Sequence, residues 1–257
     1  MKLRIILITV LAVAGLACSP TASQLKKVMQ ENPDVLHAAI EADPKGFFDV
    51  VQKVQSKARE QSMADQMNSE LKRVIEEMKE PKQAVIEPSR AVLGPSSAPI
   101  TIVEWADYNC GHCSTAAETM TKIAKEYQGK VRIVFKHLPI LAKESRTAAE
   151  YMEAIALQDK EKAIKFHKEV FANQSRLRQE GEAFLKKTVQ SVGAEMARVS
   201  KDIKSDAVKK IIDSDVAEAQ KFDFNGTPGF LVNGAAIYGA YPYDFFKKVI
   251  DHVLTNK

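Results

Sequence analysis

Residues 105–113 read WADYNCGHC and place Cys110 and Cys113 three positions apart, directly after the apolar stretch PITIVEWA at 99–106. The apolar, β-branched stretch predicts a buried strand, and the segment after it predicts a helix from about Cys110 to Tyr127. On a helix, residues i and i+3 lie about 5–6 Å apart between Cβ atoms, close to the separation that a disulfide needs. The pair can therefore open to a dithiol and close to a disulfide.

Cys110 is the expected nucleophile of this pair. It stands at the mouth of the predicted helix, where free backbone amides and the helix dipole favour a thiolate, so its pKa should lie well below the ordinary value of about 8.5. His112 can add positive charge beside the sulfur; the alternative is a solvated histidine with no electrostatic role. Gly111 leaves room for an approaching substrate.

Two other interpretations of the pair fit the sequence less well. A structural zinc site needs four ligands, and the chain has three cysteines and five histidines, without a second Cys-x-x-Cys or a His pair at ligand spacing. A purely structural disulfide is also disfavoured, because a two-residue loop constrains the unfolded chain little. The pair is therefore predicted to be a reactive dithiol that requires neither a metal nor an organic cofactor.

The N-terminus predicts export. MKLR precedes an uncharged run, IILITVLAVAGLA, so residues 1–17 are interpreted as a secretory signal peptide, too short to anchor comfortably in a bilayer. Cys18 follows in AGLACSP, which resembles a bacterial lipobox, although Gly15 stands where leucine is typical. Lipidation of Cys18 and simple cleavage after Ala17 are both open, and either accounts for an unpaired third cysteine. The predicted location is the periplasm or cell envelope, with a lipid anchor at Cys18 if that cysteine is acylated.

Residues 18–80 are predicted to form a helical stalk. NPDVLHAAIEA (32–42) and DPKGFFDVV (43–51) both begin with an N-cap residue and a proline, and the second helix can run to about Glu80 before Pro81 ends it. Its apolar residues keep helical spacing on one narrow seam with one break: Phe47, Val51, Val54 and Ala58, then Ala64, Met67, Leu71, Val74 and Met78.

Such a seam must be covered in water. We predict a homo-oligomer formed through residues 24–80, with dimer and trimer both open. The alternative is an arm that folds back on the catalytic part of the same chain.

The rest of the chain predicts an α/β domain. Residues 81–94 are interpreted as a proline-containing linker, and residues 95–257 as the domain itself. After the strand and helix around the cysteines come the strand VRIVFKHL, a long helical stretch from about 142 to 222, the strands GFLVNG and AAIYG, and a helix from about Pro242. Strands that alternate with helices indicate a layered α/β structure.

Net charge argues against nucleic acid as a partner. The formal charge is +4, and removal of Lys2 and Arg4 with a signal peptide leaves +4 − 2 = +2. This is too little for strong electrostatic attraction to a phosphate backbone, and no phosphate-binding glycine loop is present.

Three segments, AVLGPSSAPITIVEWADYNCGHC, VRIVFKHLPI and FNGTPGFLVNG, closely resemble the DsbA-like thioredoxin-fold oxidoreductases of the bacterial envelope, over about residues 90–255. The resemblance implies a thioredoxin fold with a helical insertion at about 140–222, redox activity at Cys110 and Cys113, and a cis proline at Pro228 that faces the disulfide. Thr227, before that proline, would pair with an extended substrate strand. Glu104 would be a buried acid that relays a proton to Cys113; the alternative is a glutamate at an edge or surface.

The helical N-terminal part is similar in arrangement to the oligomerising stalks of ScsC and DsbC-type proteins. The dipeptide between the cysteines is Gly-His, as in protein disulfide isomerases, where DsbA has Pro-His, so oxidase, isomerase and reductase activity all stay open. Expected partners are exported proteins with cysteines and a DsbB-like or DsbD-like membrane redox protein. Trp105, Tyr108 and Phe230 are expected to pack around the site, and Lys136 and His137 to be surface residues.

A function of another class competes with this one. A non-enzymatic, lipid-anchored envelope protein could use Cys110, His112 and Cys113 to hold a soft metal ion such as Cu(I), for which thiolates are suitable ligands.

Overall fold

The computed structural model describes residues 21–256, so the predicted signal peptide (1–17) and Cys18 lie outside the described residues. The chain divides into two compact units, one up to Met63 and one from Ala64 on. The division falls inside the predicted stalk and coincides with the break in its apolar seam, between Ala58 and Ala64.

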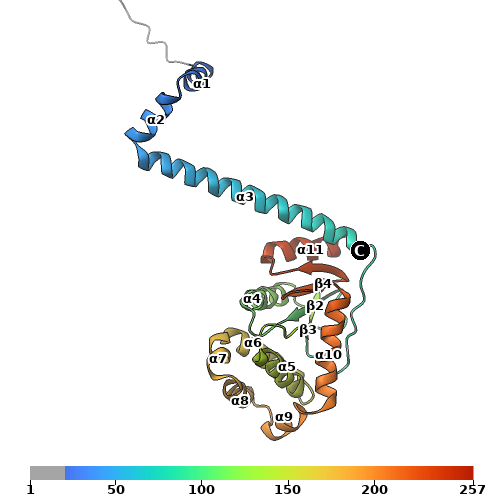
Figure 1. Ribbon diagram of the computed structural model, residues 1–257. Helices are drawn as coiled ribbons and strands as arrows, with labels where there is room; N and C mark the ends of the chain where they lie inside the picture. The colour runs from blue at the N-terminus through green and yellow to red at the C-terminus, as the bar shows by residue number, and fades with distance from the viewer. Residues whose placement is uncertain (1–20, 257) are drawn as a thin grey trace, which may run out of the picture. The chain divides into compact units, whose positions relative to one another are not determined.

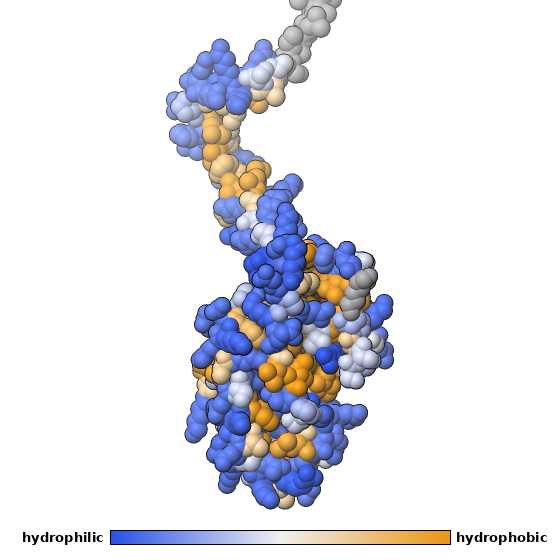
Figure 2. Space-filling view, turned by 90° about the vertical axis from the view of Figure 1, so that its right-hand side faces the viewer, coloured by the Kyte–Doolittle hydropathy of each residue, from blue (hydrophilic) through white to orange (hydrophobic). Residues whose placement is uncertain are grey.

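The first unit is helical. It contains α1 (Ala22–Glu31), α2 (Pro33–Ala42) and the first part of α3 (Pro44–Glu77). Pro33 and Pro44 begin their helices as predicted, and the Asp43 carboxylate accepts a hydrogen bond from the Gly46 backbone N–H at 2.9 Å. Large apolar side chains are exposed here, as the orange groups on this part of Figure 2 illustrate: Leu25, Val28, Met29, Val35, Leu36, Phe47, Phe48, Val50, Val54 and Met63.

The last part of α3 belongs to the second unit. Val74 is fully buried in its core, and Met67, Leu71 and Met78 pack against that core. A guanidinium nitrogen of Arg73 donates to the Ala236 carbonyl at 2.6 Å, and the Glu77 carboxylate accepts from the Ala236 N–H at 3.2 Å. The second half of the apolar seam, from Met67 to Met78, therefore packs on the catalytic part of the same chain, as the alternative interpretation of the stalk expected.

A five-stranded sheet organises the second unit. In spatial order its strands are β1 (Val92–Leu93), β3 (Val131–His137), β2 (Ile100–Ala106), β4 (Gly229–Val232) and β5 (Ala235–Tyr238). Strands β2 and β3 run parallel, while β1 and β4 run antiparallel to their neighbours. The central strands are almost continuously buried, because both faces of the sheet are covered.

Each face has its own apolar core. One carries Ile102 and Ala106 and is covered by α4 (Gly111–Glu126) and α11 (Tyr243–Thr255). The other carries Val103 and Trp105 and is covered by the end of α10 (Asp206–Lys221) and the residues after it. Figure 1 shows α4 and α10 on opposite sides of the sheet.

A helical insertion joins β3 to β4. It consists of α5 (Lys143–Ala156), α6 (Lys160–Ala172), α7 (Gln174–Glu180), α8 (Glu182–Ser191) and α9 (Met196–Asp202), and α10 leads back to the sheet (Figure 1). The observed elements match the insertion expected at about 140–222. An α/β fold with a helical insertion is thus confirmed.

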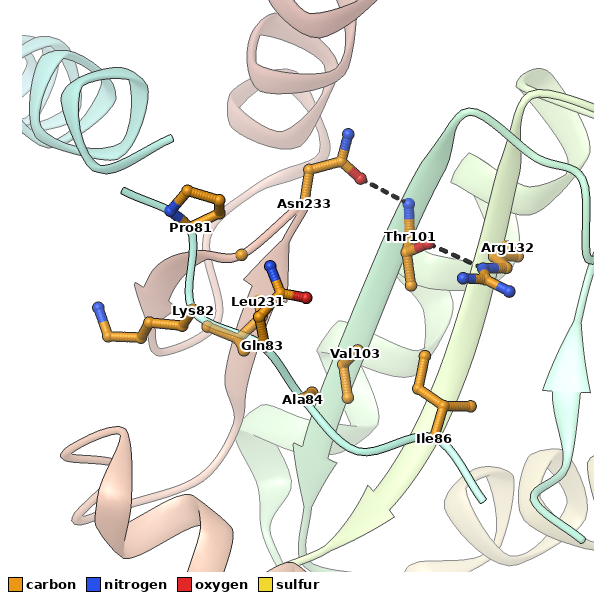
Figure 3. Close-up of a pocket in the computed structure, with 11 residues that line it drawn as sticks. Pro81, Lys82, Gln83, Ala84, Ile86, Thr101, Val103, Arg132, Leu231 and Asn233 are labelled. Carbon is orange, nitrogen blue, oxygen red and sulfur yellow. Dashed lines mark hydrogen bonds between the residues drawn. The ribbon is translucent and has the colours of Figure 1, made fainter. Parts of the chain in front are cut away.

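The segment predicted as a linker, residues 81–94, is packed on the sheet. The Lys82 N–H donates to the Gly234 carbonyl at 3.0 Å, and the Val85 N–H donates to the Glu218 carboxylate at 2.7 Å. Gly234 has φ of +88°, and a Cβ there would lie 2.5 Å from the Pro81 ring, so only glycine fits. Figure 3 shows this segment crossing the strands. Residues of the segment and of β2, β3 and β4 line a hollow of about 270 Å³.

Candidate active site

The turn between β2 and α4 places Cys110 at the helix N-cap. The Cys110 N–H donates to the Asp107 carbonyl at 3.0 Å. The Asp107 carboxylate is buried and accepts four hydrogen bonds of 2.6–2.9 Å, from the backbone N–H groups of Asn109, Ile140 and Leu141 and from the Ser145 hydroxyl. This carboxylate fixes the turn that presents the cysteine.

The two thiols of the pair differ strongly. Cys110 is 6% exposed, and its pKa is lowered to about 5. The largest cause is a hydrogen bond from the Cys113 thiol, and hydrogen bonding with Thr227 and with the helix-start amides lowers the pKa further. Burial acts in the opposite direction and raises it. Cys113 is fully buried, and burial together with the neighbouring Cys110 raises its pKa. A thiolate is therefore favoured at Cys110 and a thiol at Cys113.

The loop before β4 lies against this sulfur. The Cys110 Sγ is 3.4 Å from the Thr227 carbonyl oxygen, and the Thr227–Pro228 peptide bond is cis. A hollow of about 360 Å³ borders the loop and is lined by Gly226, Thr227, Pro228, Tyr238 and neighbouring residues. Residues 117 positions apart in the sequence are thus brought together at the site.

Glu104 is a buried acid. It lies on β2 between Phe135 of β3 and Phe230 of β4, and it faces the same core as Ile102, Ala106 and Cys113. Its side chain is 0% exposed, and neither carboxylate oxygen has a hydrogen-bond partner among the described residues. Because burial removes the carboxyl group from water, desolvation raises the pKa of Glu104 to about 8. A carboxyl group in this state exchanges protons near neutral pH, and the edge or surface alternative does not hold.

His112 and Gly111 occupy the outer side of the first turn of α4. The His112 side chain is exposed. A Cβ added at Gly111 would have no described atom within 4 Å, so this side of the site is open to a large partner.

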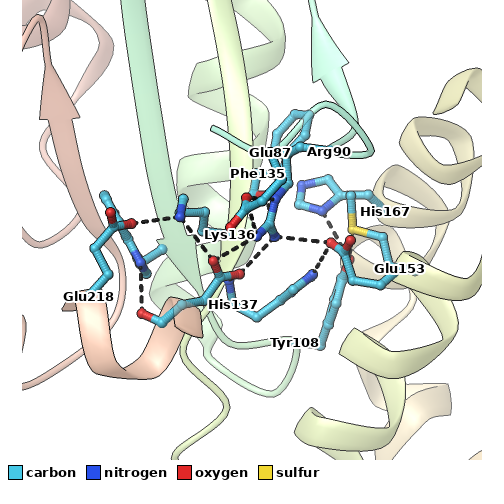
Figure 4. Close-up of polar contacts among 12 residues, drawn as sticks. Glu87, Arg90, Tyr108, Phe135, Lys136, His137, Glu153, His167 and Glu218 are labelled. Atoms are coloured by element: carbon cyan, nitrogen blue, oxygen red, sulfur yellow. Dashed lines mark hydrogen bonds and ion pairs between the residues drawn. The ribbon is translucent and has the colours of Figure 1, made fainter. Parts of the chain in front are cut away.

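The prediction that Lys136 and His137 are surface residues was wrong, since both are 2% exposed. Lys136 Nζ lies 3.1 Å from Asp215 and 2.6 Å from Glu218, and His137 Nε2 lies 2.9 Å from Glu153. Arg90, from the packed 81–94 segment, joins the cluster through Asp215 at 2.7 Å and Glu153 at 3.1 Å. Figure 4 shows this buried charge cluster, which the strand's own pattern could not reveal because the partners come from distant segments.

The sequence did not single out Gln174 or Asp107. Gln174 is a buried residue of the helical insertion whose side-chain amide reaches the active-site turn, and no local pattern marks it. Asp107 has a recognisable signal, because an aspartate that follows a strand often accepts the N–H two residues later, here that of Asn109.

Within residues 21–256, no group of three or more histidine, cysteine or acidic side chains is arranged to hold a metal ion. Across the same residues, no helix has the length and apolar character needed to cross a membrane.

A sheet covered on both faces and a Cys-x-x-Cys at a helix start define the class of thioredoxin-fold proteins, to which this chain adds a helical insertion. A thioredoxin family model matches residues 86–252, more than half of the chain. The chain belongs to the DsbA-like thioredoxin-fold family of thiol-disulfide oxidoreductases.

Individual proteins of known sequence or structure are similar to this chain. A probable disulfide bond formation protein D of Bacillus cereus is 33% identical over 167 residues, which cover 61% of this chain and 75% of that protein. The structure of oxidised BdbD from Bacillus subtilis is 26% identical with a TM-score of 0.62, over 68% of this chain and 98% of that one. A linker-deletion mutant of Proteus mirabilis ScsC shares the fold at 18% identity and a TM-score of 0.59, over 94% of this chain and 100% of that one.

Proposed function

We propose that this protein exchanges disulfides with cysteine-containing proteins outside the cytoplasm, with Cys110 as the nucleophile and Cys113 as the resolving thiol. The observation that carries the proposal is the position of the Cys110 sulfur, at the N-cap of α4 and 3.4 Å from the Thr227 carbonyl oxygen, with Cys113 fully buried in the same helical turn. The opposite pKa shifts of the two thiols agree with these roles. The sequence similarity to the probable disulfide bond formation protein D of Bacillus cereus supports the proposal.

The exchange proceeds through a mixed disulfide. In reduction of a substrate, the Cys110 thiolate attacks one sulfur of the substrate disulfide, and the other sulfur leaves as a thiolate that takes up a proton. Cys113 then loses its proton and attacks the Cys110 sulfur, which releases the second substrate thiol and closes the Cys110–Cys113 disulfide. The same steps in reverse oxidise a substrate dithiol.

Glu104 is assigned the proton transfer of the second step. Cys113 must lose a proton although burial raises its pKa. The ionised fraction of a carboxyl group with a pKa of about 8 on the same side of the sheet can accept that proton near neutral pH, and the protonated form can return it in the reverse step. Thr227 and Pro228 are assigned to the substrate, whose extended strand would pair with the loop backbone beside the Cys110 sulfur. His112, exposed next to that sulfur, would contribute positive charge.

The first unit is assigned to self-association. Its large apolar side chains are exposed on helices that, over the described residues, bury none of their side chains before Met63. A second copy of the chain supplies a matching surface, and two or three catalytic units in one assembly would hold a mispaired substrate while its disulfides are exchanged, as an isomerase requires. A DsbB-like or DsbD-like membrane protein would exchange electrons with the enzyme, and Cys18 would carry a lipid if the N-terminal segment is processed as a lipoprotein.

Two refolding assays test the proposal. Reduced ribonuclease should regain activity faster with the oxidised enzyme, and scrambled ribonuclease faster with the partly reduced oligomer. Cys110→Ala should abolish both activities, whereas Thr121→Ala, at an exposed position further along the same helix, should leave them near the parent's level. Equal rates with and without the parent enzyme would overturn the assignment.

A further inference from the structure

One side chain of the helical insertion contacts both ends of the active-site turn. The Nε2 atom of Gln174, at the start of α7, donates to the Tyr108 carbonyl at 2.9 Å and to the Cys110 carbonyl at 2.8 Å. Gln174 is 8% exposed, so its amide has little freedom to leave these acceptors for water.

We propose that Gln174 is a positioning residue for the thiol chemistry: its amide holds the carbonyls of Tyr108 and Cys110 and thereby sets the environment of the Cys110 sulfur. This inference rests on the proposed function of Cys110. Under this proposal the helical insertion contributes to catalysis, because Gln174, which hydrogen-bonds the backbone carbonyl of the nucleophile, belongs to the insertion and not to the thioredoxin fold.

The effect is electrostatic as well as geometric. A carbonyl oxygen near a thiolate carries partial negative charge that disfavours the thiolate, and a donated N–H offsets that charge. The Cys110 carbonyl also accepts the first helical hydrogen bond of α4, from the Ser114 N–H at 3.2 Å. Gln174 therefore completes the hydrogen bonding of the N-cap residue and fixes the backbone from which the sulfur projects.

A second contact supports the same link. The Ser114 hydroxyl, one turn into α4, donates to the Phe171 carbonyl at the end of α6, at 3.1 Å. The first turn of the active-site helix is thus bound to the insertion at two places, Cys110 and Ser114. Of these two contacts, the one at Cys110 involves the nucleophile itself.

The test compares Gln174→Met and Gln174→Glu in the full chain with Gln190→Met, an exposed glutamine of α8. Methionine has a similar size but no donor, and glutamate adds negative charge. The Cys110 pKa should rise by about one unit with methionine, equivalent to tenfold less thiolate at pH values below both pKas, and by more with glutamate. The dithiol–disulfide equilibrium should shift about tenfold toward the disulfide, which is about 30 mV more negative in reduction potential.

The readouts are the pH profile of thiolate absorbance, the potential against glutathione, and the melting temperature. If the Gln174 variants only lower the melting temperature, while the Cys110 pKa and the potential equal those of Gln190→Met, the inference is overturned. If the parent's Cys110 itself titrates near 8.5, the ordinary value for a free thiol, the proposed function fails instead.

A measurement on the unaltered protein decides the case in which the variants do not fold. In the NMR spectrum of the reduced parent, the Gln174 side-chain amide protons should exchange slowly and should shift with pH in step with the Cys110 titration. Rapid exchange, or an amide signal that does not follow that titration, would overturn the inference.

Discussion

The sulfur of Cys110 lies 3.4 Å from the carbonyl oxygen of Thr227. This contact joins the start of α4 to the loop before β4, so the nucleophile and the backbone proposed to bind a substrate strand occupy one small area. With a thiol at Cys110 the contact is a weak hydrogen bond. Ionisation of Cys110 removes that donor, and the thiolate is then stabilised by hydrogen bonding with the Cys113 thiol, with Thr227 and with the helix-start amides.

The first prediction concerns the acidity of Cys110. Its pKa is lowered to about 5, so at pH 7 the thiolate should predominate and alkylation by iodoacetamide should lose half its rate only near pH 5. Because the folded pKa lies below the unfolded one, Cys110 contributes to the stability of the reduced protein an amount that grows as pH rises from about 5 toward 9 and is lost as pH falls through 5, and the difference in unfolding free energy between the parent and Cys110→Ala should follow this course. An alkylation midpoint near the free-thiol value of about 8.5 would contradict this prediction.

The second prediction concerns Cys113. Cys113→Ala removes the resolving thiol, so reaction with a substrate disulfide should stop at a mixed disulfide on Cys110, visible by mass spectrometry as a covalent adduct that dithiothreitol releases. The same variant removes the hydrogen bond that contributes most to the lowered pKa, so the Cys110 pKa should rise above about 5. Cys113→Ser, which retains a hydroxyl donor, should show a smaller rise with the same trapped adduct.

The third prediction concerns Glu104. Its pKa is raised from an unfolded value of about 4.5 to about 8, so the folded protein holds a proton that the unfolded chain releases. The contribution of Glu104 to the unfolding free energy should therefore fall by about 1.4 kcal/mol per pH unit between about pH 5 and 8, read as the difference between the parent and Glu104→Gln. Glu104→Gln should remove this dependence and unfold at higher urea than the parent at pH 8. Glu118→Gln, at an exposed position of α4, should retain the parent's profile.

The fourth prediction concerns the buried charge cluster. Arg90→Met leaves Asp215 and Glu153 buried with one cation fewer, which should cost about 3–5 kcal/mol of unfolding free energy. Arg146→Met breaks a half-exposed ion pair with Glu150 and Asp213 and should cost less than about 1 kcal/mol. Similar losses in urea unfolding for the two variants would contradict the assignment of Arg90 to the stability of the fold.

The contrast between Cys110 and Arg90 explains what the sequence could predict. The strand, the helix start and the spacing of the cysteines are local features, so the reactive pair followed from residues 99–127, and the α/β fold followed from the alternation of strands and helices over residues 95–257. Arg90 stands in a proline-containing stretch that has the composition of a linker, and its partners lie 63 and 125 positions away. Nothing local indicates that such a residue is buried.

The same limit applies to Lys136, His137 and Gln174. Charged residues at the end of a strand are usually exposed. Here α10 supplies Asp215 as a partner of Lys136, and α5 supplies Glu153 as a partner of the His137 ring. A glutamine in a long helical stretch has no sequence property that distinguishes a side chain directed at a catalytic turn from one in solvent. These residues depend on tertiary neighbours, which the periodicity of one segment does not specify.

The last prediction separates the two halves of the α3 seam. Phe47 and Val54 are exposed by 44% and 60%, whereas Leu71 packs on the core of the second unit. Phe47→Glu together with Val54→Glu should dissociate the proposed oligomer and leave the unfolding of the catalytic unit unchanged, because a charge at these positions disrupts only a surface between copies. Leu71→Glu should instead destabilise the catalytic unit, because it buries a carboxylate against apolar side chains.

Solution mass by light scattering and urea unfolding measure the two effects independently, with Gln52→Glu as the control, since this exposed residue lies well off the seam on the same helix. The parent and the control should have a mass two or three times that of the chain, and the double variant the mass of one chain. A parent that is already monomeric would refute self-association through this helix, and a double variant with the parent's mass would place the contact elsewhere. Because mixed-disulfide exchange needs one catalytic unit alone, the monomeric variant should still oxidise reduced ribonuclease while losing activity on the scrambled form.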